Sequence, residues 1–420
     1  MKLSQINTGQ KIAVIGAGIV GVCCALYLQR KGYNVELIDP NGVAQQCSKG
    51  NAGHFATEQI FPLADKNLLP QLPKMLLDPS GPFKIRPTYL IKALPWFSRF
   101  VLNMRNGKFD AHKAALKLLN AAALDAYHPL LKAAGLQNML LKHGSLLTFE
   151  RTKRKQIQQQ YEAFKAEGVN LQWLDNQQTL ALEPKLCKQV SSTFYFEDVA
   201  HTIDPEQFCQ RLAEYFFMRG GTLVKDQVEL INPHVSGVEL QQRRGCYNYA
   251  KVIVATGAWS KALLTPLKYK LPLDTERGYH LMLSNLDTLS RPVASAERKF
   301  IMTPMQSGLR LAGTVEFAGL DAPMDPRRAD SLLAQAQKLL PDIGLNVGKD
   351  PIRWMGCRPS LPDSLPVLGE ATRHKHLYFA FGHQHLGLTQ AAITGKLIAQ
   401  QLAGESTSID LSPFSISRFN

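Results

Sequence analysis

The first forty residues contain two short apolar runs separated by a longer segment with helical spacing. The apolar runs are Ile12–Ile15 and Val35–Ile38, the segment between them covers Ile19–Lys31, and Asp39 follows the second run. Short continuous apolar runs are typical of strands buried on both faces of a sheet. The order therefore predicts a strand, a glycine turn, a helix and a second strand.

Residues 12–28 carry no charge, a property that also fits a signal sequence or a membrane span. Two features argue against both of these. The preceding residues are polar with only two lysines, and no small-residue cleavage site follows. Three glycines at fixed spacing point instead to a phosphate-binding turn.

Beyond this unit the pattern predicts further helices and short strands. Seven prolines between residues 62 and 105 exclude one long helix there, so short helices and turns are expected. Between residues 261 and 351, short apolar runs alternate with turns, as in an antiparallel sheet that forms a separate layer. The other expected elements are polar helices at 111–134 and 153–167, a strand at 144–150, a helix at 205–218 with Asp204 as N-cap, a buried strand ending at Thr256, a helix at 328–340, and a closing strand, glycine turn and helix.

The glycine turn has the spacing G-x-G-x-x-G, formed by Gly16, Gly18 and Gly21. Such glycines allow a tight turn, close approach of the backbone to a pyrophosphate, and packing of the helix on the strand. The helix N-terminus that follows favours negative charge. Asp39 stands where a carboxylate accepts hydrogen bonds from ribose hydroxyls and repels a 2′-phosphate. These residues predict a site for FAD or NAD rather than NADP.

Composition narrows the class of protein. The chain has 420 residues, 45% hydrophobic and 20% charged, which is ordinary for a globular protein of two or three domains. Its net charge of +14 indicates anionic partners such as a phosphate-bearing cofactor, a carboxylate substrate or acidic lipid. Nucleic acid is not expected, because no base-reading motif is present. Seven scattered cysteines without metal-binding spacing indicate a reduced, cytoplasmic protein.

Seven motifs occur in an order that carries a family resemblance. They are VIGAGIVGVCCALYLQRKGYNVELID, NAGHF, VIVATGAWS, ERGYH, LRLAGTVEF, GCRPSLPDSLPVLG and GHQHLGLTQA. Together they resemble the D-amino-acid oxidase/dehydrogenase family of FAD enzymes, most of all the bacterial D-amino-acid dehydrogenases, including the D-hydroxyproline dehydrogenase type. The resemblance selects FAD over NAD.

The resemblance implies an α/β fold with a Rossmann-like FAD-binding domain and a mixed antiparallel-sheet α+β substrate domain. The expected FAD-binding domain consists of residues 1–60, 200–262 and 352–420, and the substrate or cap domain of residues 61–199 and 263–351. The implied reaction is oxidative deamination of a D-amino acid, of which D-proline or hydroxy-D-proline is one type. Hydride passes from Cα to flavin N5, and electrons then pass to a quinone or another non-oxygen acceptor. Two alternatives are a glycine- or sarcosine-type amine oxidase that uses oxygen, and an FAD subunit of a larger oxidoreductase complex.

Three residues are candidates for contact with the substrate. Arg358 matches the arginine that clamps the substrate carboxylate in related enzymes, and its planar guanidinium suits two parallel hydrogen bonds. A structural ion pair with Asp363 is the competing interpretation. His54, in a glycine-rich loop, is expected to face the substrate and to affect amine deprotonation, or else to pack or cap. Of Tyr279 and His280, strand alternation sends only one to the site, and the tyrosine hydroxyl is the better candidate.

The motifs also imply a set of cofactor-binding residues. His383 and His385 suggest a metal pair, but no third ligand at useful spacing accompanies them, so no metal is expected. Cys357 lies one position from the cysteine that holds FAD covalently in sarcosine-oxidase relatives, which favours non-covalent FAD. The expected FAD-binding residues are Gly16, Gly18, Gly21, Asp39, Ser48, Asn51, Ala52, Gly53, Val228, Thr256, Gly257, Trp259, Gly356, Gly382, His383, Gly387, Leu388 and Thr389.

The segment IRPTYLIKALPWFSRFVLNM mixes aromatic and basic residues. This composition is typical of a helix that lies in a membrane interface, and it equally fits a buried cover over the flavin entrance. The first interpretation predicts a cytoplasmic protein that associates peripherally with the inner face of the cell membrane, where a quinone acceptor is available.

Overall fold

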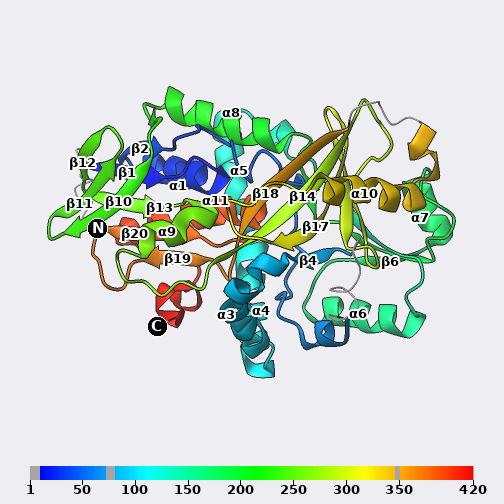
Figure 1. Ribbon diagram of the computed structural model, residues 1–420. Coiled ribbons are helices and arrows are strands. Elements are labelled where there is room, and N and C mark those ends of the chain that lie inside the picture. The colour runs from blue at the N-terminus through cyan, green and yellow to red at the C-terminus, as the bar shows by residue number, and fades with distance from the viewer. Residues whose placement is uncertain (1–9, 72–80, 346–350, 420) are drawn as a thin grey trace.

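The computed structural model describes residues 10–71, 81–345 and 351–419. Two sheets organise these residues, one on each side of the molecule in Figure 1. The first is six-stranded and parallel, except for its edge strand β19, which is antiparallel to β20. Its strands in order are β19 (Val367–Glu370), β20 (Leu377–Phe381), β13 (Lys251–Val254), β1 (Lys11–Ile15), β2 (Asn34–Ile38) and β9 (Thr222–Val224).

Helices and a small sheet cover the two faces of this parallel sheet. On one face lie α1 (Ile19–Arg30), α8 (Pro205–Met218) and α11 (Gly387–Leu402). A Cβ at Gly395 of α11 would come 2.5 Å from the carbonyl oxygen of Cys23, so glycine is needed for this close approach of α1 and α11. The other face is covered by the antiparallel strands β10 (Val228–His234), β11 (Gly237–Gln242) and β12 (Gly245–Tyr249), together with α9 (Ser260–Leu264).

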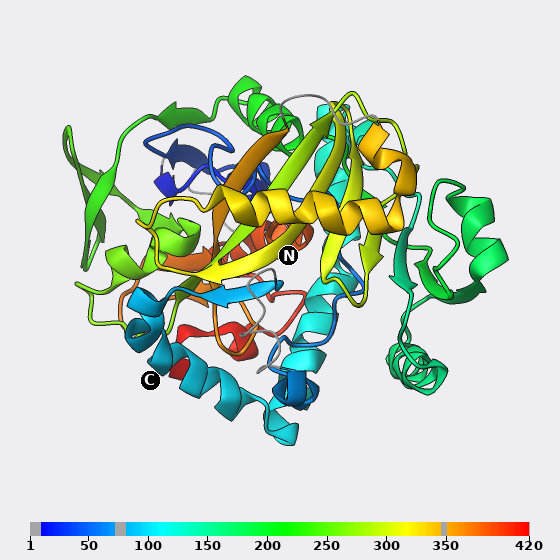
Figure 2. The same cartoon turned by 45° about the vertical axis from the view of Figure 1, so that its right-hand side comes forward.

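The second sheet is larger and mostly antiparallel (Figure 2). Helix α10 (Pro326–Leu339) packs on one of its faces, where Leu332 joins Leu281 and Leu311 in a common core. Two strand pairs are parallel, β15 with β5 and β17 with β4. The order is β18 (Ile352–Ser360), β14 (Asp274–Ser284), β17 (Gly308–Phe317), β16 (Phe300–Met305), β15 (Val293–Ser295), β5 (Ser145–Phe149), β7 (Ser192–Phe196) and β6 (Gln172–Asp175), with β4 (Phe83–Ile85) beside β17.

Strand β18 connects the two sheets. It pairs along its length with β14 at the edge of the larger sheet, and after a turn at residues 361–366 the chain enters β19 of the parallel sheet. Other elements are the short pair β3 (His54–Phe55) and β8 (Ala200–His201), and the helices α6 (Arg154–Ala166) and α7 (Asn176–Leu182). The sequence prediction of an α/β fold with a separate, mainly antiparallel layer is confirmed.

The helix expected at 111–134 is instead two helices, α4 (Asn106–Ala121) and α5 (Ala123–Ala134). The break at Ala122 allows the apolar faces of both helices to enter the core around α1 and α11. The Tyr27 hydroxyl of α1 donates to the Ala126 carbonyl, and the Tyr127 hydroxyl donates to the Leu388 carbonyl of α11. Placing residues 61–199 wholly in a cap domain therefore does not match this packing, because α4 and α5 lie against the helices of the parallel sheet.

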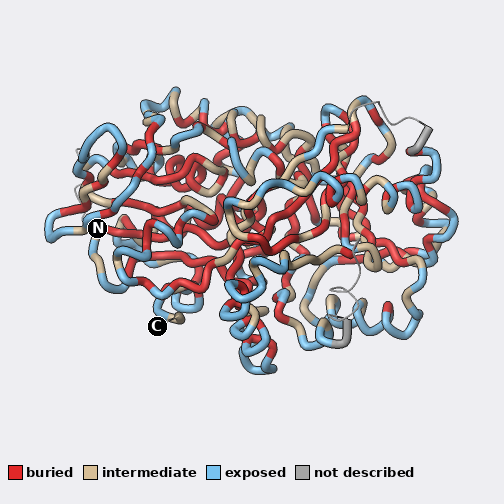
Figure 3. Tube along the Cα trace, in the orientation of Figure 1, coloured by how far each residue is buried: buried red, intermediate tan, exposed pale blue. Residues whose placement is uncertain are grey.

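The proline-rich segment forms a longer helix than expected. Helix α3 (Leu90–Asn103) extends over fourteen residues with Pro95 inside it. The rings of Trp96 and Phe100 stack on each other, and Trp96 also contacts Phe317 of β17. This aromatic packing stabilises the helix although Pro95 cannot donate its backbone hydrogen bond. Figure 3 shows buried residues through both sheets and exposed residues along the outer sides of α3 and α4.

Candidate active site

A cavity of about 2250 Å³ extends from the carboxyl ends of the parallel strands to the larger sheet. Small-molecule sites usually occupy about 300–1,000 Å³. This cavity therefore has room for a ligand of dinucleotide size and a small substrate beside it. In open α/β sheets, ligands bind at the carboxyl ends of the strands, as here.

The glycine turn after β1 forms one end of the cavity. Gly16 has φ +103°, and a Cβ there would lie 2.5 Å from the carbonyl oxygen of Ala255. At Gly21, a Cβ would lie 1.9 Å from the carbonyl oxygen of Gly16. Gly16 and Gly18 line the cavity, whereas Gly21 lies beneath them and acts through packing. The turn thus presents bare backbone and the N-terminus of α1 to a ligand, as a pyrophosphate needs.

Asp39, at the end of β2, holds the same region together. One carboxylate oxygen accepts from the Ala17 N–H at 3.0 Å, and the other accepts from the N–H groups of Asn41 and Gly42. Ser48 supports the helix start in a similar way, because its Oγ accepts from the Ile19 N–H at 2.9 Å. A carboxylate offers about four acceptor positions, so Asp39 keeps capacity for a ribose hydroxyl. Both residues line the cavity.

The N-terminus of α11 faces the cavity from the other side. Gly387 and Leu388 line the cavity. The apolar side chain of the N-cap residue Leu386 cannot accept hydrogen bonds from the first N–H groups of the helix. These donors favour negative charge in front of them. Thr389 is buried outside the lining, where its Oγ1 accepts from the Ala56 N–H and fixes the loop that carries His54.

Most of the expected cofactor residues come together in this cavity. The structure fits FAD at three points: the glycine turn, the Asp39 carboxylate and the start of α11. Three further predicted residues, Gly21, Gly53 and Gly356, lie behind the lining, where added Cβ atoms would meet Gly16, Thr202 and Trp354. The predicted cofactor residues that line the cavity are Gly16, Gly18, Asp39, Ser48, Asn51, Ala52, Val228, Thr256, Gly257, Trp259, Gly382, His383, Gly387 and Leu388.

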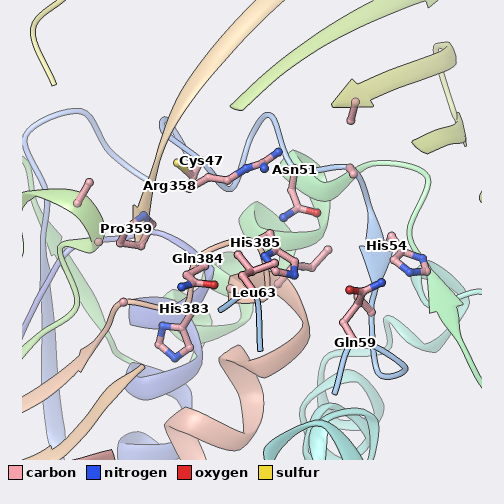
Figure 4. Close-up of a pocket in the computed structure, with 18 of the residues that line it drawn as sticks. Cys47, Asn51, His54, Gln59, Leu63, Arg358, Pro359, His383, Gln384 and His385 are labelled. Carbon is pink, nitrogen blue, oxygen red and sulfur yellow. The ribbon is translucent and has the colours of Figure 1, made fainter. Parts of the chain in front are cut away.

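Arg358 lines the cavity from β18 (Figure 4). In the register of β14 and β18 it stands opposite Glu276, whose Oε1 accepts from the Ser360 Oγ at 2.6 Å. Gly278 leaves space for the guanidinium, because a Cβ there would lie 2.5 Å from the Arg358 Cζ. Among the residues that the structure describes, none forms an ion pair or a hydrogen bond with this guanidinium.

The competing ion pair between Arg358 and Asp363 does not form. Asp363 instead accepts from the Arg418 Nε at 2.7 Å, and Arg418 also donates to three backbone carbonyls. Arg418 thereby fastens the turn between β18 and β19. The arginine needed for structure is Arg418, and Arg358 keeps its five N–H donors for a ligand.

His54 lines the cavity and has a carboxylate partner. Its Nε2 lies 2.9 Å from the Glu58 Oε1, and both side chains are largely buried. The second atom of each group, His54 Nδ1 and Glu58 Oε2, is buried without a partner among the described residues. Glu58 also lines the cavity. Glu58 follows His54 by four positions. This spacing predicts a side-chain contact only within a helix, so the sequence of this loop did not indicate the contact between them.

Tyr279 departs from the expected role. Its hydroxyl donates to the Glu316 Oε2 at 2.7 Å, and its ring lies beneath the Arg328 guanidinium in the core against α10. Strand alternation places it on the face of β14 away from the cavity. The same alternation directs His280 toward the cavity side, where it stacks on Trp354 with ring centroids 4.9 Å apart. The prediction that Tyr279 faces the substrate is corrected by this placement.

Sequence reasoning missed several residues of the lining. Trp354 is among them, and Gly50 and Gly356 leave the space for its indole ring. His385 lies between Arg358 and His54 in Figure 4. Burial and, to a smaller extent, the charge of Arg358 lower the pKa of His385 to about 4, while Glu58 acts in the opposite direction. Burial lowers the pKa of His383 to about 3. Both imidazoles are therefore neutral at pH 7.

Strand alternation puts the Cys357 side chain on the opposite face of β18 from Arg358, and the Cys47 thiol donates to the Cys357 carbonyl. No three His, Cys, Asp or Glu side chains in residues 10–71, 81–345 and 351–419 gather as metal ligands would. In the same residues, no helix combines the length and the apolar character needed to cross a membrane.

Comparison with known proteins gives a consistent result. A D-amino-acid oxidase of Bradyrhizobium diazoefficiens is 34% identical over 419 residues, which cover 98% of this chain and 99% of that protein. A D-amino acid dehydrogenase of Vibrio cholerae is 29% identical, with 94% and 96% covered. The crystal structure of glycine oxidase from Geobacillus kaustophilus shares the fold, with a TM-score of 0.75 and 22% identity over 97% and 99% of the two chains. The family model described as FAD dependent oxidoreductase (DAO) matches residues 11–401, and the chain belongs to this family of flavoenzymes.

Proposed function

We propose that the protein oxidises a D-amino acid at Cα, with non-covalently bound FAD, and passes the electrons to a quinone or another acceptor that is not oxygen. FAD, when bound, accepts the hydride that leaves the substrate Cα. The curated relatives named above support D-amino acids as the substrate class. D-Proline and hydroxy-D-proline belong to the substrates to be tested.

The observation that carries the proposal is the unpaired guanidinium of Arg358 in the cavity. A half-buried cation that no carboxylate of the described residues contacts is costly unless a ligand supplies the opposite charge. The buried Glu276 carboxyl, whose pKa burial raises and the charge of Arg358 tends to lower, bonds to Ser360 and not to the guanidinium. An α-carboxylate supplies that charge and matches the guanidinium with two parallel hydrogen bonds. Two bonds fix the orientation of the substrate as well as its position, which a single ammonium group would not do.

The other polar residues of the lining set the charge around the substrate amine. Hydride loss requires the neutral amine, so a group must accept its proton. His54, which lines the cavity and is held by Glu58 at 2.9 Å, is proposed for this role. His385 stays neutral at pH 7 and so adds no positive charge that would oppose a protonated amine on arrival.

The orientation of the Cys357 side chain supports non-covalent attachment. Its side chain belongs to the face of β18 opposite Arg358, and burial raises the pKa of its thiol. A thiol is a weak nucleophile compared with its thiolate. Precipitation of the protein with acid tests this directly, because non-covalent FAD goes into the supernatant and covalent flavin stays with the pellet.

Anaerobic reduction by a panel of amino acids tests the main proposal. We expect rapid bleaching of the flavin absorbance by one or more D-amino acids, none by their L-enantiomers, and slow reoxidation when air is admitted. Fast reoxidation with formation of hydrogen peroxide supports an oxidase that uses oxygen as the acceptor, and the Bradyrhizobium relative is named a D-amino-acid oxidase. If no D-amino acid bleaches the flavin, the proposed substrate class is wrong.

A further inference from the structure

Helix α3 exposes an unusual number of apolar side chains. Ile91 is 81% exposed, and Leu90, Leu94, Val101 and Leu102 are each 45–54% exposed. These five residues, here called the outer face of α3, are a third of the fifteen large apolar side chains that are exposed among the described residues. Single exposed apolar residues are common, but a contiguous set of them on one helix indicates a surface that binds a membrane or another molecule.

The aromatic residues of α3 do not contribute to the outer face. Trp96 and Phe100 point inward, where Trp96 packs against Phe317 and its indole N–H donates to the Ser360 carbonyl. At 100° per residue, the exposed row formed by Leu90, Leu94 and Val101 lies next to the row formed by Ile91 and Leu102. The helix therefore has two apolar sides, and only one of them is used inside the protein.

Basic residues border the outer face. The segment from Lys84 to Phe109 contains six lysines and arginines and no aspartate or glutamate. Lys92 and Arg99, seven positions apart, share the row beside Ile91 and Leu102. Arg105 and Lys108 follow at the end of the helix. These four are exposed, and none of them forms an ion pair with a residue in the described part of the chain.

We propose that the outer face of α3 docks on an anionic lipid bilayer, with its aliphatic side chains in the interface and its basic residues at the headgroups. An aliphatic surface bordered by four basic residues, unpaired among the described residues, is complementary to a bilayer of this kind. Asp110, the first acidic residue after them, is paired with Lys113. A protein partner with an apolar patch, or a second copy of this chain, matches the aliphatic residues but would leave the uncompensated positive charge at its edge.

Docking at this face places the cavity next to the bilayer. Met104, Asn106, Phe109 and Asp110, which immediately follow the outer face, line the large cavity. An acceptor dissolved in the membrane, such as a quinone, would approach the cavity from this edge. This consequence rests on the proposed function, whereas the docking itself does not.

Sedimentation of the FAD-loaded protein with lipid vesicles tests the proposal. We expect binding to vesicles that contain phosphatidylglycerol, weaker binding at high salt, and little binding to pure phosphatidylcholine. The double substitution Lys92→Gln and Arg99→Gln should weaken binding to anionic vesicles about 25-fold, from about fivefold for each charge. Its control, Arg243→Gln with Arg244→Gln in the β11–β12 turn, removes two positive charges from a part of the molecule away from α3, where Arg243 lies 3.8 Å from Glu229, and should have no effect.

The apolar side chains are tested separately. Ile91→Gln with Leu94→Gln should reduce binding more than about tenfold. The matched control is Met218→Gln with Val235→Gln, which removes two apolar side chains that are 76% and 96% exposed on other faces. Equal losses in variant and control, or no vesicle binding by the unmodified protein, overturn the proposal. Loss of a dimer in the α3 variant without any effect of lipid shows that a second copy covers this face, and also overturns it.

Hydrogen exchange of the unmodified protein provides a readout that does not depend on the folding of a variant. We expect anionic vesicles to slow amide hydrogen exchange in residues 90–103. Slower exchange in other segments, with no change in residues 90–103, contradicts the proposal. Flavin reduction by D-amino acids, measured without lipid, should be unchanged in the α3 variants. Failure of that reduction in the unmodified protein refutes the proposed substrate class while vesicle binding remains, so the two failures are distinguishable.

Discussion

Replacement of Arg358 by lysine is the sharpest test of the proposed site. Lysine keeps the charge but has no planar pair of donors, so one of the two hydrogen bonds to the substrate carboxylate is lost. A hydrogen bond to a charged group contributes about 1.5–3 kcal/mol, which corresponds to about 10- to 150-fold in the dissociation constant. Because the guanidinium has no partner among the described residues, the protein itself should remain as stable as before.

The assay is anaerobic stopped-flow reduction of the bound flavin at increasing concentrations of a D-amino acid. It yields the dissociation constant of the substrate and the limiting rate of reduction separately. We expect the dissociation constant to rise within the range above and the FAD content to stay unchanged. Arg353→Lys is a matched control on the same strand, since Arg353 lies outside the cavity and pairs with Asp330 at the surface. An unchanged dissociation constant in Arg358→Lys removes Arg358 from the substrate site.

Three further substitutions have defined outcomes. Gly278→Ala places a Cβ 2.5 Å from the Arg358 Cζ, so substrate binding should weaken at least tenfold although Arg358 is retained; normal binding would show that the guanidinium relocates without loss. Arg418→Met leaves the buried Asp363 without its partner and should lower the free energy of unfolding, measured by urea titration, by about 3–5 kcal/mol. The control Arg327→Met, at an exposed ion pair, should change it by less than about 1 kcal/mol. Burial lowers the pKa of His383 to about 3, so this residue takes up a proton more readily in the unfolded chain than in the folded one. Its contribution to the free energy of unfolding is therefore fully present above pH 6.5 and is lost progressively as the pH falls toward 3. By pH 5 this loss amounts to about 2 kcal/mol. The free energy of unfolding should therefore fall less between pH 7 and pH 5 in His383→Gln than in the unmodified protein. Equal falls in the two proteins would contradict the pKa argument.

The cofactor end of the site could be read from the sequence because its signals are local. Gly16, Gly18 and Gly21 stand in one turn. Gly16 and Gly21 must be glycine because an added Cβ would meet backbone atoms, and Gly18 lines the cavity. Asp39 follows directly from the second strand. Spacing over about thirty residues is enough to define a strand, a turn and a helix, since the contacts involved lie within one βαβ unit.

The substrate end depended on contacts between distant segments. The sequence left two partners open for Arg358, and the folded chain excludes one of them, because Arg418 takes Asp363. Tyr279 and His280 were interchangeable by alternation until the register of β14 placed Tyr279 against α10. The local sequence pattern specifies which residues share a face of a strand or helix, but not which other segment of the chain packs against that face.

The sequence by itself determined the cofactor-binding turn, because hydrophobic periodicity and glycine spacing act over short distances. The likeness to flavoenzymes, and the class of the fold that it implies, came from the order of seven motifs along the chain. Tertiary structure alone decided the direction of the Tyr279 side chain, the pairing of His54 with Glu58, and the free guanidinium of Arg358. It also decided that α3 buries its aromatic side and exposes its aliphatic one. The physical reason is the same in each case: a side chain's partner is set by which segments pack together, and residues far apart in the chain supply those segments.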